Sequence, residues 1–306
     1  MSLHAALALG LSALLLGAAA CGRADAPPTQ AADTTAAVLP DSISVAGFST
    51  PESVLYDDVA DVYLVSNING EPLGRDDNGF ISRVAPDGTV QQLKWIDGAA
   101  AEVTLNAPKG MAIIGDTLFV SDIDSVRAFS RTTGAMLGAR AVPGSTFLND
   151  LAAGGGVLYV SDSGLKPDFS SSGTDAVYRF EGNRAVVVVR DTALKGPNGL
   201  VVGPNGVTIV PFGAKTIMRV AAAGGAIMPV ATLTFGQLDG VVHTPDGGLL
   251  VSSWETKTVY HIDAQGQAHP VVQNVESPAD IGFDTRRNRV LIPSFMKNTI
   301  EIRAVR

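Results

Sequence analysis

The sequence has little charge, few aromatic residues and a single cysteine. Charged side chains make up 17% of its 306 residues and aromatic ones 6%, whereas an ordinary globular domain has about 25% charged residues. One cysteine cannot form an internal disulfide, so a disulfide-stapled scaffold is excluded. With a formal net charge of −8, the chain also lacks the clustered lysine and arginine that a phosphate backbone requires. We therefore expect no nucleic-acid partner.

Residues that break regular structure are abundant instead. The chain holds 33 glycines and 17 prolines, and its hydrophobic content is 46%. This apolar content is ample for a core and excludes disorder over most of the chain. Frequent turns together with a large apolar fraction favour many short elements over long helices.

The first 20 residues resemble a secretory signal peptide. Residues 5–20 (AALALGLSALLLGAAA) form an uncharged run of 16 residues, shorter than the roughly 20 that span a bilayer. Small residues end this run just before Cys21, where a lipoprotein signal places its acylated cysteine. The alternative is simple cleavage after an Ala-x-Ala site, because the first four residues lack lysine and arginine and Ala18 replaces the usual leucine.

Both interpretations predict export. Residues 21–37 are small, polar and proline-containing, a composition typical of a flexible tether, and the folded domain is expected to occupy residues 38–306. We predict a periplasmic or cell-envelope monomer whose only membrane contact is a lipid anchor at Cys21.

A short block recurs six times along residues 38–306. The second residues of these blocks, here called the anchors, are Glu52, Lys109, Asn149, Asn198, Asp239 and Ala279. They are 57, 40, 49, 41 and 40 residues apart, close to the period of a four-stranded propeller blade. Each block is followed by an apolar run such as LFVSD and an alternating stretch such as AVYRFEG, which both predict strands. Six such repeats without a convincing helix predict an all-β, six-bladed β-propeller.

The last repeat is too short for a complete blade, with only 28 residues from Ala279 to Arg306. The segment 41–49 (DSISVAGFS) has strand character but belongs to no repeat. We therefore predict that this N-terminal strand completes blade six, closing the ring and covering both open sheet edges.

The anchors should meet on the propeller axis, because the innermost strand of each blade lines the central channel. The carboxylates of Glu52 and Asp239 and the amides of Asn149 and Asn198 are hard-oxygen ligands of the kind that Ca²⁺ prefers. No cluster of His or Cys accompanies them, so zinc or copper is not expected. The alternative is that the Asn-Gly and Asp-Gly pairs are ordinary turns and that Lys109 pairs with Glu52 or Asp239 in place of a cation.

Six residues that follow the second strand of each blade are expected to rim the same mouth of the channel. With Lys109 they are the channel or substrate candidates: Asn67, Asp122, Asp162, Phe212, Trp254 and Phe295. The repeated VSD sequence also allows Asp122 and Asp162 to bond inside their blades. Trp254 and Phe295 are expected to pack at the mouth or to stack on a substrate. Two loops, residues 67–80 and 168–174, are candidates for covering it.

The anchors resemble the metal site of the senescence marker protein/gluconolactonase family of six-bladed propellers, which is regucalcin-like. In that family a glutamate opens blade one, asparagines open blades three and four, and an aspartate opens blade five. Here these positions hold Glu52 in PESVLYD, Asn149 in FLNDL, Asn198 in GPNGL and Asp239 in QLDGV. The resemblance covers residues 38–306. It implies a divalent-metal hydrolase of lactones or related esters, with Asp239 as both ligand and base or nucleophile.

Three departures from the family keep a second hypothesis open. Lys109 stands at the blade-two anchor, where an ammonium group would repel a cation. No histidine on the anchor side is placed to act as a separate base, and the family's substrate-recognising residues have no match beyond the metal ligands. The second hypothesis is a non-catalytic propeller, resembling NHL-type repeats, that binds a sugar, peptide or envelope partner at its rim. Both share one fold, so the fold does not decide between them.

Overall fold

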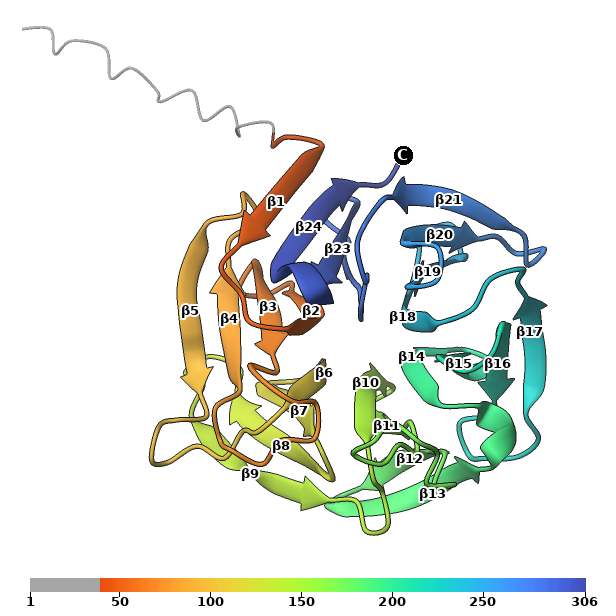
Figure 1. Ribbon diagram of the computed structural model, residues 1–306, viewed down its shortest axis with the longest axis horizontal. Coiled ribbons are helices and arrows are strands. Elements are labelled where there is room, and N and C mark those ends of the chain that lie inside the picture. The colour runs from red at the N-terminus through yellow and green to blue at the C-terminus, as the bar shows by residue number, and fades with distance from the viewer. Residues whose placement is uncertain (1–38) are drawn as a thin grey trace, which may run out of the picture. The chain divides into compact units, whose positions relative to one another are not determined.

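Six four-stranded antiparallel sheets surround a central channel in the computed structural model, which describes residues 39–306 (Figure 1). The sequence-based prediction of a six-bladed, all-β propeller is confirmed. The predicted signal peptide (1–20), tether (21–37) and lipidation site at Cys21 lie outside the described residues and stay predictions. Within residues 39–306, no helix is long and apolar enough to cross a membrane.

The strands follow one another from the inside of each blade to the outside. Blades one to three contain β2 (Pro51–Asp57), β3 (Val62–Asn67), β4 (Phe80–Val84), β5 (Val90–Asp97), β6 (Pro108–Ile114), β7 (Thr117–Asp122), β8 (Ser125–Ser130), β9 (Met136–Ala141), β10 (Leu148–Gly154), β11 (Val157–Asp162), β12 (Ala176–Glu181) and β13 (Arg184–Arg190). Blades four to six contain β14 (Pro197–Gly203), β15 (Gly206–Pro211), β16 (Thr216–Val220), β17 (Met228–Thr232), β18 (Leu238–His243), β19 (Leu249–Ser253), β20 (Thr258–Ile262), β21 (Ala268–Gln273), β22 (Gly282–Asp284), β23 (Arg289–Ser294) and β24 (Thr299–Ala304). Two 3₁₀ turns, η1 (Thr192–Leu194) and η2 (Phe295–Lys297), complete the described secondary structure.

The N-terminal strand closes the ring, as predicted. β1 (Ser42–Ala46) pairs antiparallel with β24, from Ser42 opposite Arg303 to Ala46 opposite Thr299, and forms the outer edge of blade six. Val45 is buried on this strand and belongs to the same apolar cluster as Ile300 and Ile302. Ring closure therefore depends on side-chain packing as well as on backbone pairing.

Burial changes across each blade. In blade one, every residue of β3 is buried, whereas half of the residues of β5 are exposed and only one is buried. The second strand is covered by the adjacent blades on both faces, so its sequence is a nearly continuous apolar run rather than an alternating one. The apolar clusters accordingly join neighbouring blades, as where Phe119 of blade two packs with Leu151 and Tyr178 of blade three. This packing fixes the inner strands that carry the anchors.

Candidate metal centre

Each anchor of blades one to five lies in a β-bulge of the innermost strand. In blade one, Pro51 pairs with Asn67 and Val54 pairs with Val65, so the inner strand has one extra residue between these pairs. The same shift occurs in β6, β10, β14 and β18. A bulge re-aims the side chain beside it, and here it turns the side chains of four anchors, Glu52, Asn149, Asn198 and Asp239, toward the axis. Blade six differs, because β22 begins only after Ala279.

A repeated serine of the second strand stabilises the bulge in blades one, three and five. Ser66 Oγ accepts the N–H of Ser53 at 2.9 Å, and Ser161 and Ser252 accept the corresponding N–H groups of Asp150 and Gly240. Ser161 also donates to the Asn198 carbonyl of the next blade's inner strand, and Ser252 to the Ala279 carbonyl just before β22, each at 2.8 Å. In these three blades the serine thus satisfies a backbone donor that the bulge leaves unpaired.

Asn198–Gly199 and Asp239–Gly240 are not turns, since both pairs lie inside strands β14 and β18. Glycine is required there because the next inner strand passes very close. A Cβ on Gly199 would overlap the carbonyl oxygen of Asp239, and one on Gly240 would overlap the backbone nitrogen of Ile281. The turn interpretation of these pairs is therefore wrong, and the close approach of the strands explains the glycines.

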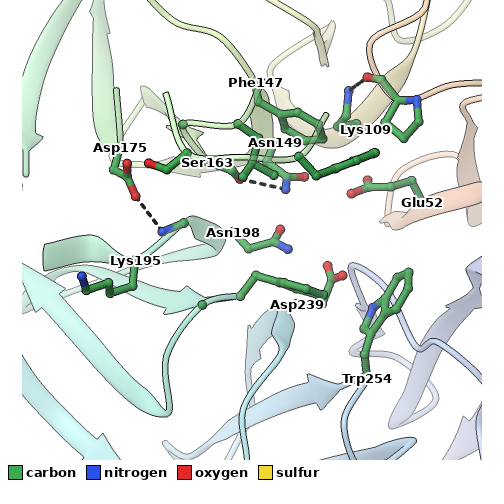
Figure 2. Close-up of a pocket in the computed structure, with 18 of the residues that line it drawn as sticks. Glu52, Lys109, Phe147, Asn149, Ser163, Asp175, Lys195, Asn198, Asp239 and Trp254 are labelled. Carbon is green, nitrogen blue, oxygen red and sulfur yellow. Dashed lines mark hydrogen bonds between the residues drawn. The ribbon is translucent and has the colours of Figure 1, made fainter. Parts of the chain in front are cut away.

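Four buried oxygens on the axis have no hydrogen-bond partner among the described residues. They are Glu52 Oε2, Asn149 Oδ1, Asn198 Oδ1 and Asp239 Oδ1. Their residues are only 4–6% exposed, and Figure 2 shows the four side chains directed toward one common space. The Asn149 amide nitrogen donates to Ser163 Oγ at 3.1 Å, which leaves its oxygen facing the axis. Buried acceptors without a donor are costly, so this ring of oxygens is suited to hold a cation.

The two acids of this ring lie in an environment that disfavours their charge. Burial raises the pKa of Glu52 well above its usual range, and repulsion from Asp239 and Asp280 raises it further, while Lys109 opposes the change. The pKa of Asp239 is likewise raised well above normal, first by burial and then by Asp280; the Trp254 indole N–H beside it works in the opposite direction. That N–H is itself buried and has no hydrogen-bond partner among the described residues. A cation in the ring would stabilise both carboxylates.

Lys109 does not occupy the space between the ring oxygens. Its Nζ donates to the carbonyl oxygens of Pro72 at 2.8 Å and Ala107 at 3.0 Å and lies 4.6 Å from the centre of the Phe147 ring. Burial lowers the pKa of Lys109 to about 8. Figure 2 shows the amine directed toward the Pro72 carbonyl rather than toward Glu52. The expected alternative, an ion pair that replaces the metal, is not found; Lys109 instead holds the loop of residues 68–79.

The ring forms the floor of a pocket of about 600 Å³. Phe212, Trp254 and Phe295 line it as predicted, with Trp254 between the other two at ring-centre distances of 5.8 and 5.4 Å. Ile68 and Pro72 reach it from the blade-one loop, and residues 163–175 contribute a second rim segment. Both candidate loops therefore border the mouth.

The other three rim candidates do not line this pocket. Asn67, Asp122 and Asp162 are fully buried and bond inside their blades. Asp122 accepts the N–H of Ala107 at 2.9 Å and Nε of Arg127 at 2.8 Å, and the other two accept N–H groups of the segments that lead into β2 and β10. The expectation that Asn67 rims the mouth is wrong, whereas Asp122 and Asp162 take the second role that the VSD sequence allowed, bonding inside their blades. All three side chains turn sideways to bond the segment before an inner strand.

Phe147 and Asp175 are among the pocket residues that sequence reasoning missed. Phe147 lies two positions before the anchor Asn149, and that spacing along an extended chain was an available signal. Asp175 lies just before β12 and accepts the Gly196 N–H at 2.7 Å, while its Oδ2 is buried without a partner. No motif marks Asp175 in the sequence. Across residues 39–306 there is no cluster of three or more His, Cys, Asp or Glu suited to a metal, since the ring combines two carboxylates with two amides.

Comparisons with known proteins establish the fold. No protein-family model matches the chain, and no curated protein matches it in sequence. Among solved structures, a gluconolactonase of Xanthomonas campestris is 18% identical with a TM-score of 0.66, over 87% of this chain and 89% of its own. The calcium-binding protein regucalcin of Agrobacterium tumefaciens is 16% identical with a TM-score of 0.59, over 83% and 90%. Virginiamycin B lyase of Staphylococcus aureus is 12% identical with a TM-score of 0.62, over 85% and 98%.

Proposed function

We propose that this protein is an exported, metal-dependent hydrolase of lactones or related esters. The observation that carries the proposal is the ring of four unpartnered buried oxygens from Glu52, Asn149, Asn198 and Asp239. The structural likeness to a gluconolactonase and to a calcium-binding regucalcin supports the same reaction class and a divalent cation. Export and a lipid anchor at Cys21 remain part of the proposal on sequence grounds alone.

The residues fit a calcium-like cation by their chemistry. Two carboxylates and two amide oxygens supply hard ligands, and water completes the six to eight that Ca²⁺ takes. Glu52 and Asp239 together offset a charge of two, whereas Asn149 and Asn198 contribute oxygens without charge. When bound, the cation would supply a Lewis acid to polarise a substrate carbonyl.

Asp239 is the proposed catalytic residue, as base or nucleophile. Its carboxylate lies at the pocket floor with the Trp254 indole N–H beside it (Figure 2). One carboxylate oxygen belongs to the ring, and the other is available to accept a proton from water or to attack the carbonyl carbon. No histidine lines the pocket among the described residues, so this chain's own base is a carboxylate. Trp254 and its aromatic neighbours exclude bulk water from the carbonyl.

The test compares wild type with Asp239→Ala in calcium and in chelator. We expect calcium to raise the wild-type melting temperature by several degrees, as a ligand that binds only the folded state does, and to support lactone hydrolysis. Asp239→Ala should lose both effects, with hydrolysis reduced at least about a hundredfold. Asp116→Ala, which removes an exposed acid on the turn between β6 and β7, serves as the matched control and should keep both. A wild type that is indifferent to chelator and inert on lactones and esters would instead favour a non-catalytic binding propeller.

A further inference from the structure

Above the ring of oxygens, the pocket wall is mainly apolar. Its large side chains come from five blades, and they are Ile68, Phe147, Leu165, Phe212, Trp254 and Phe295. Phe169, on the blade-three loop, extends this surface to the mouth and is 55% exposed. A substrate seated on the ring would therefore place everything beyond its reacting carbonyl against aromatic and aliphatic groups.

Few charged groups of the wall are placed to recognise a polar substrate beside the ring. Lys109 Nζ is held by two carbonyl oxygens, and Figure 2 shows the Lys195 amine directed away from Glu52 and Asp239. Asp175 Oδ1 accepts a backbone N–H, and its Oδ2 is covered by protein atoms. The described residues that line the pocket include no Arg, Gln or His.

A polyhydroxylated substrate would leave most of its hydroxyl groups without partners on such a wall, and buried polar groups without partners are costly. Apolar substituents gain free energy in the same place in proportion to the area that they bury. The pocket volume of about 600 Å³ lies within the range of small-molecule sites and leaves room for a substituent beyond a lactone ring.

We propose that the pocket selects an uncharged lactone or ester with an aliphatic or aromatic substituent, rather than a sugar lactone. This rests on the proposed function, since it assigns the substrate class of the same site. Phe212 and Phe169 are the specificity-determining residues, because they border the space beyond the reacting carbonyl without contributing to the ring of oxygens.

Binding is tested first, without turnover, using lactams as hydrolysis-resistant isosteres of lactones. Calorimetry on the calcium-loaded protein compares δ-valerolactam with its 6-pentyl derivative. We expect the pentyl compound to bind at least about tenfold more tightly. Phe212→Ala and the surface variant Phe169→Ala should each reduce that ratio about threefold or more. Leu137→Ala, which removes a side chain 60% exposed on β9 away from the pocket, should leave the ratio unchanged. Equal affinities of the two lactams would overturn the inference.

Hydrolysis of three δ-lactones then separates this inference from the proposed function. We expect calcium-dependent kcat/KM to rank the 6-pentyl δ-lactone above δ-valerolactone by at least about tenfold, and δ-gluconolactone at or below δ-valerolactone. If δ-gluconolactone ranks first, the inferred apolar substrate class is wrong, but the proposed lactone hydrolysis is supported. If none of the three shows calcium-dependent hydrolysis although calcium binds, the hydrolase itself is wrong, and the inference that rests on it fails as well.

Discussion

The two ends of the channel both bury acidic residues, but they satisfy them differently. At the pocket end, ring oxygens of Glu52 and Asp239 have no partner. At the opposite end, Asp150 accepts the N–H groups of Leu151 and Leu200, each at 2.6 Å. Asp280 there accepts the Ser53 hydroxyl at 2.5 Å. The difference separates acids that hold the blades together from acids suited to a ligand.

Neighbouring residues supply the two ends. Asn149 belongs to the ring, whereas Asp150 lies at the floor of a second cavity of about 470 Å³. That cavity is bordered by the later residues of the inner strands, so it opens at the other end of the channel. Adjacent side chains of a strand point in opposite directions. At the bulge, Asn149 and Asp150 therefore face opposite ends of the channel.

The largest expected effect contrasts Asp150→Ala with Asn149→Ala. Asp150→Ala leaves two buried N–H groups without acceptors, so we expect the free energy of unfolding to fall by about 3 kcal/mol. Asn149→Ala removes one hydrogen bond but also one unpartnered oxygen, and should cost less than about 1 kcal/mol. Urea denaturation in chelator at pH 5 measures both, because repulsion among the buried acids is reduced by protonation there.

The order of the two variants should be reversed for calcium affinity, with Asn149→Ala affected more than Asp150→Ala. Asn149→Ala removes a ring oxygen, and we expect it to lower calcium affinity by about tenfold or more, because each ligand contributes to the coordination shell. Calcium titration at neutral pH measures this value for each variant that stays folded. The contrast between the two ends is wrong if Asn149→Ala is the more destabilising variant in chelator and still binds calcium like wild type.

The second prediction concerns pH and the opposite end. Burial raises the pKa of Asp280 to about 7, although hydrogen bonds from Ser53 and Asp150 work against the increase. A carboxyl with a raised pKa binds its proton more tightly in the folded state. Its stabilising contribution is therefore fully present below about pH 4 and is lost as the pH rises through about 7. Asp280→Asn should flatten this dependence.

Thermal melts in chelator between pH 4 and pH 8 check that expectation. Wild type should lose several degrees more than Asp280→Asn over this interval. Ser53→Ala is the matched control, since it removes the hydroxyl donor and keeps the titrating carboxyl. Parallel pH profiles for wild type and Asp280→Asn would show that another group controls the pH response.

The smallest expected effect comes from Lys109, which joins the ring to the blade-one loop. Lys109→Met removes a buried positive charge close to Glu52, so we expect calcium to bind several-fold more tightly. It also removes the donor to the Pro72 carbonyl, which should increase proteolysis within residues 68–79. Lys195→Met serves as the control, because this lysine points away from the ring. Weaker calcium binding in Lys109→Met would indicate that the hydrogen bonds of Lys109 to Pro72 and Ala107 hold the ring oxygens in position.

The sequence was sufficient to predict the blade number, the closing strand and the residues of the ring. Each of these predictions depended on the repeat period, since a repeat of about 40 residues places equivalent residues of successive blades at the same distance from the axis. The direction of Lys109 was not predictable, because its long side chain bonds to Pro72 in an irregular loop whose path the repeat period does not determine. For Asp122 and Asp162 the repeated VSD sequence allowed two positions, at the mouth or inside the blade, and the fold shows that they turn into the blade.

The seam between β1 and β24 has a consequence for synthesis and for mechanical load. It pairs the first described strand with the last, and the paired residues are more than 250 positions apart in the chain. The ring of blades therefore cannot close until β24 has been synthesised. Any tension applied through the residues before Ser42 would reach the propeller at this seam and would act on its five residue pairs. If the propeller were tethered through its N-terminal side, the pairing of β1 with β24 would thus be the first contact to carry a pulling force.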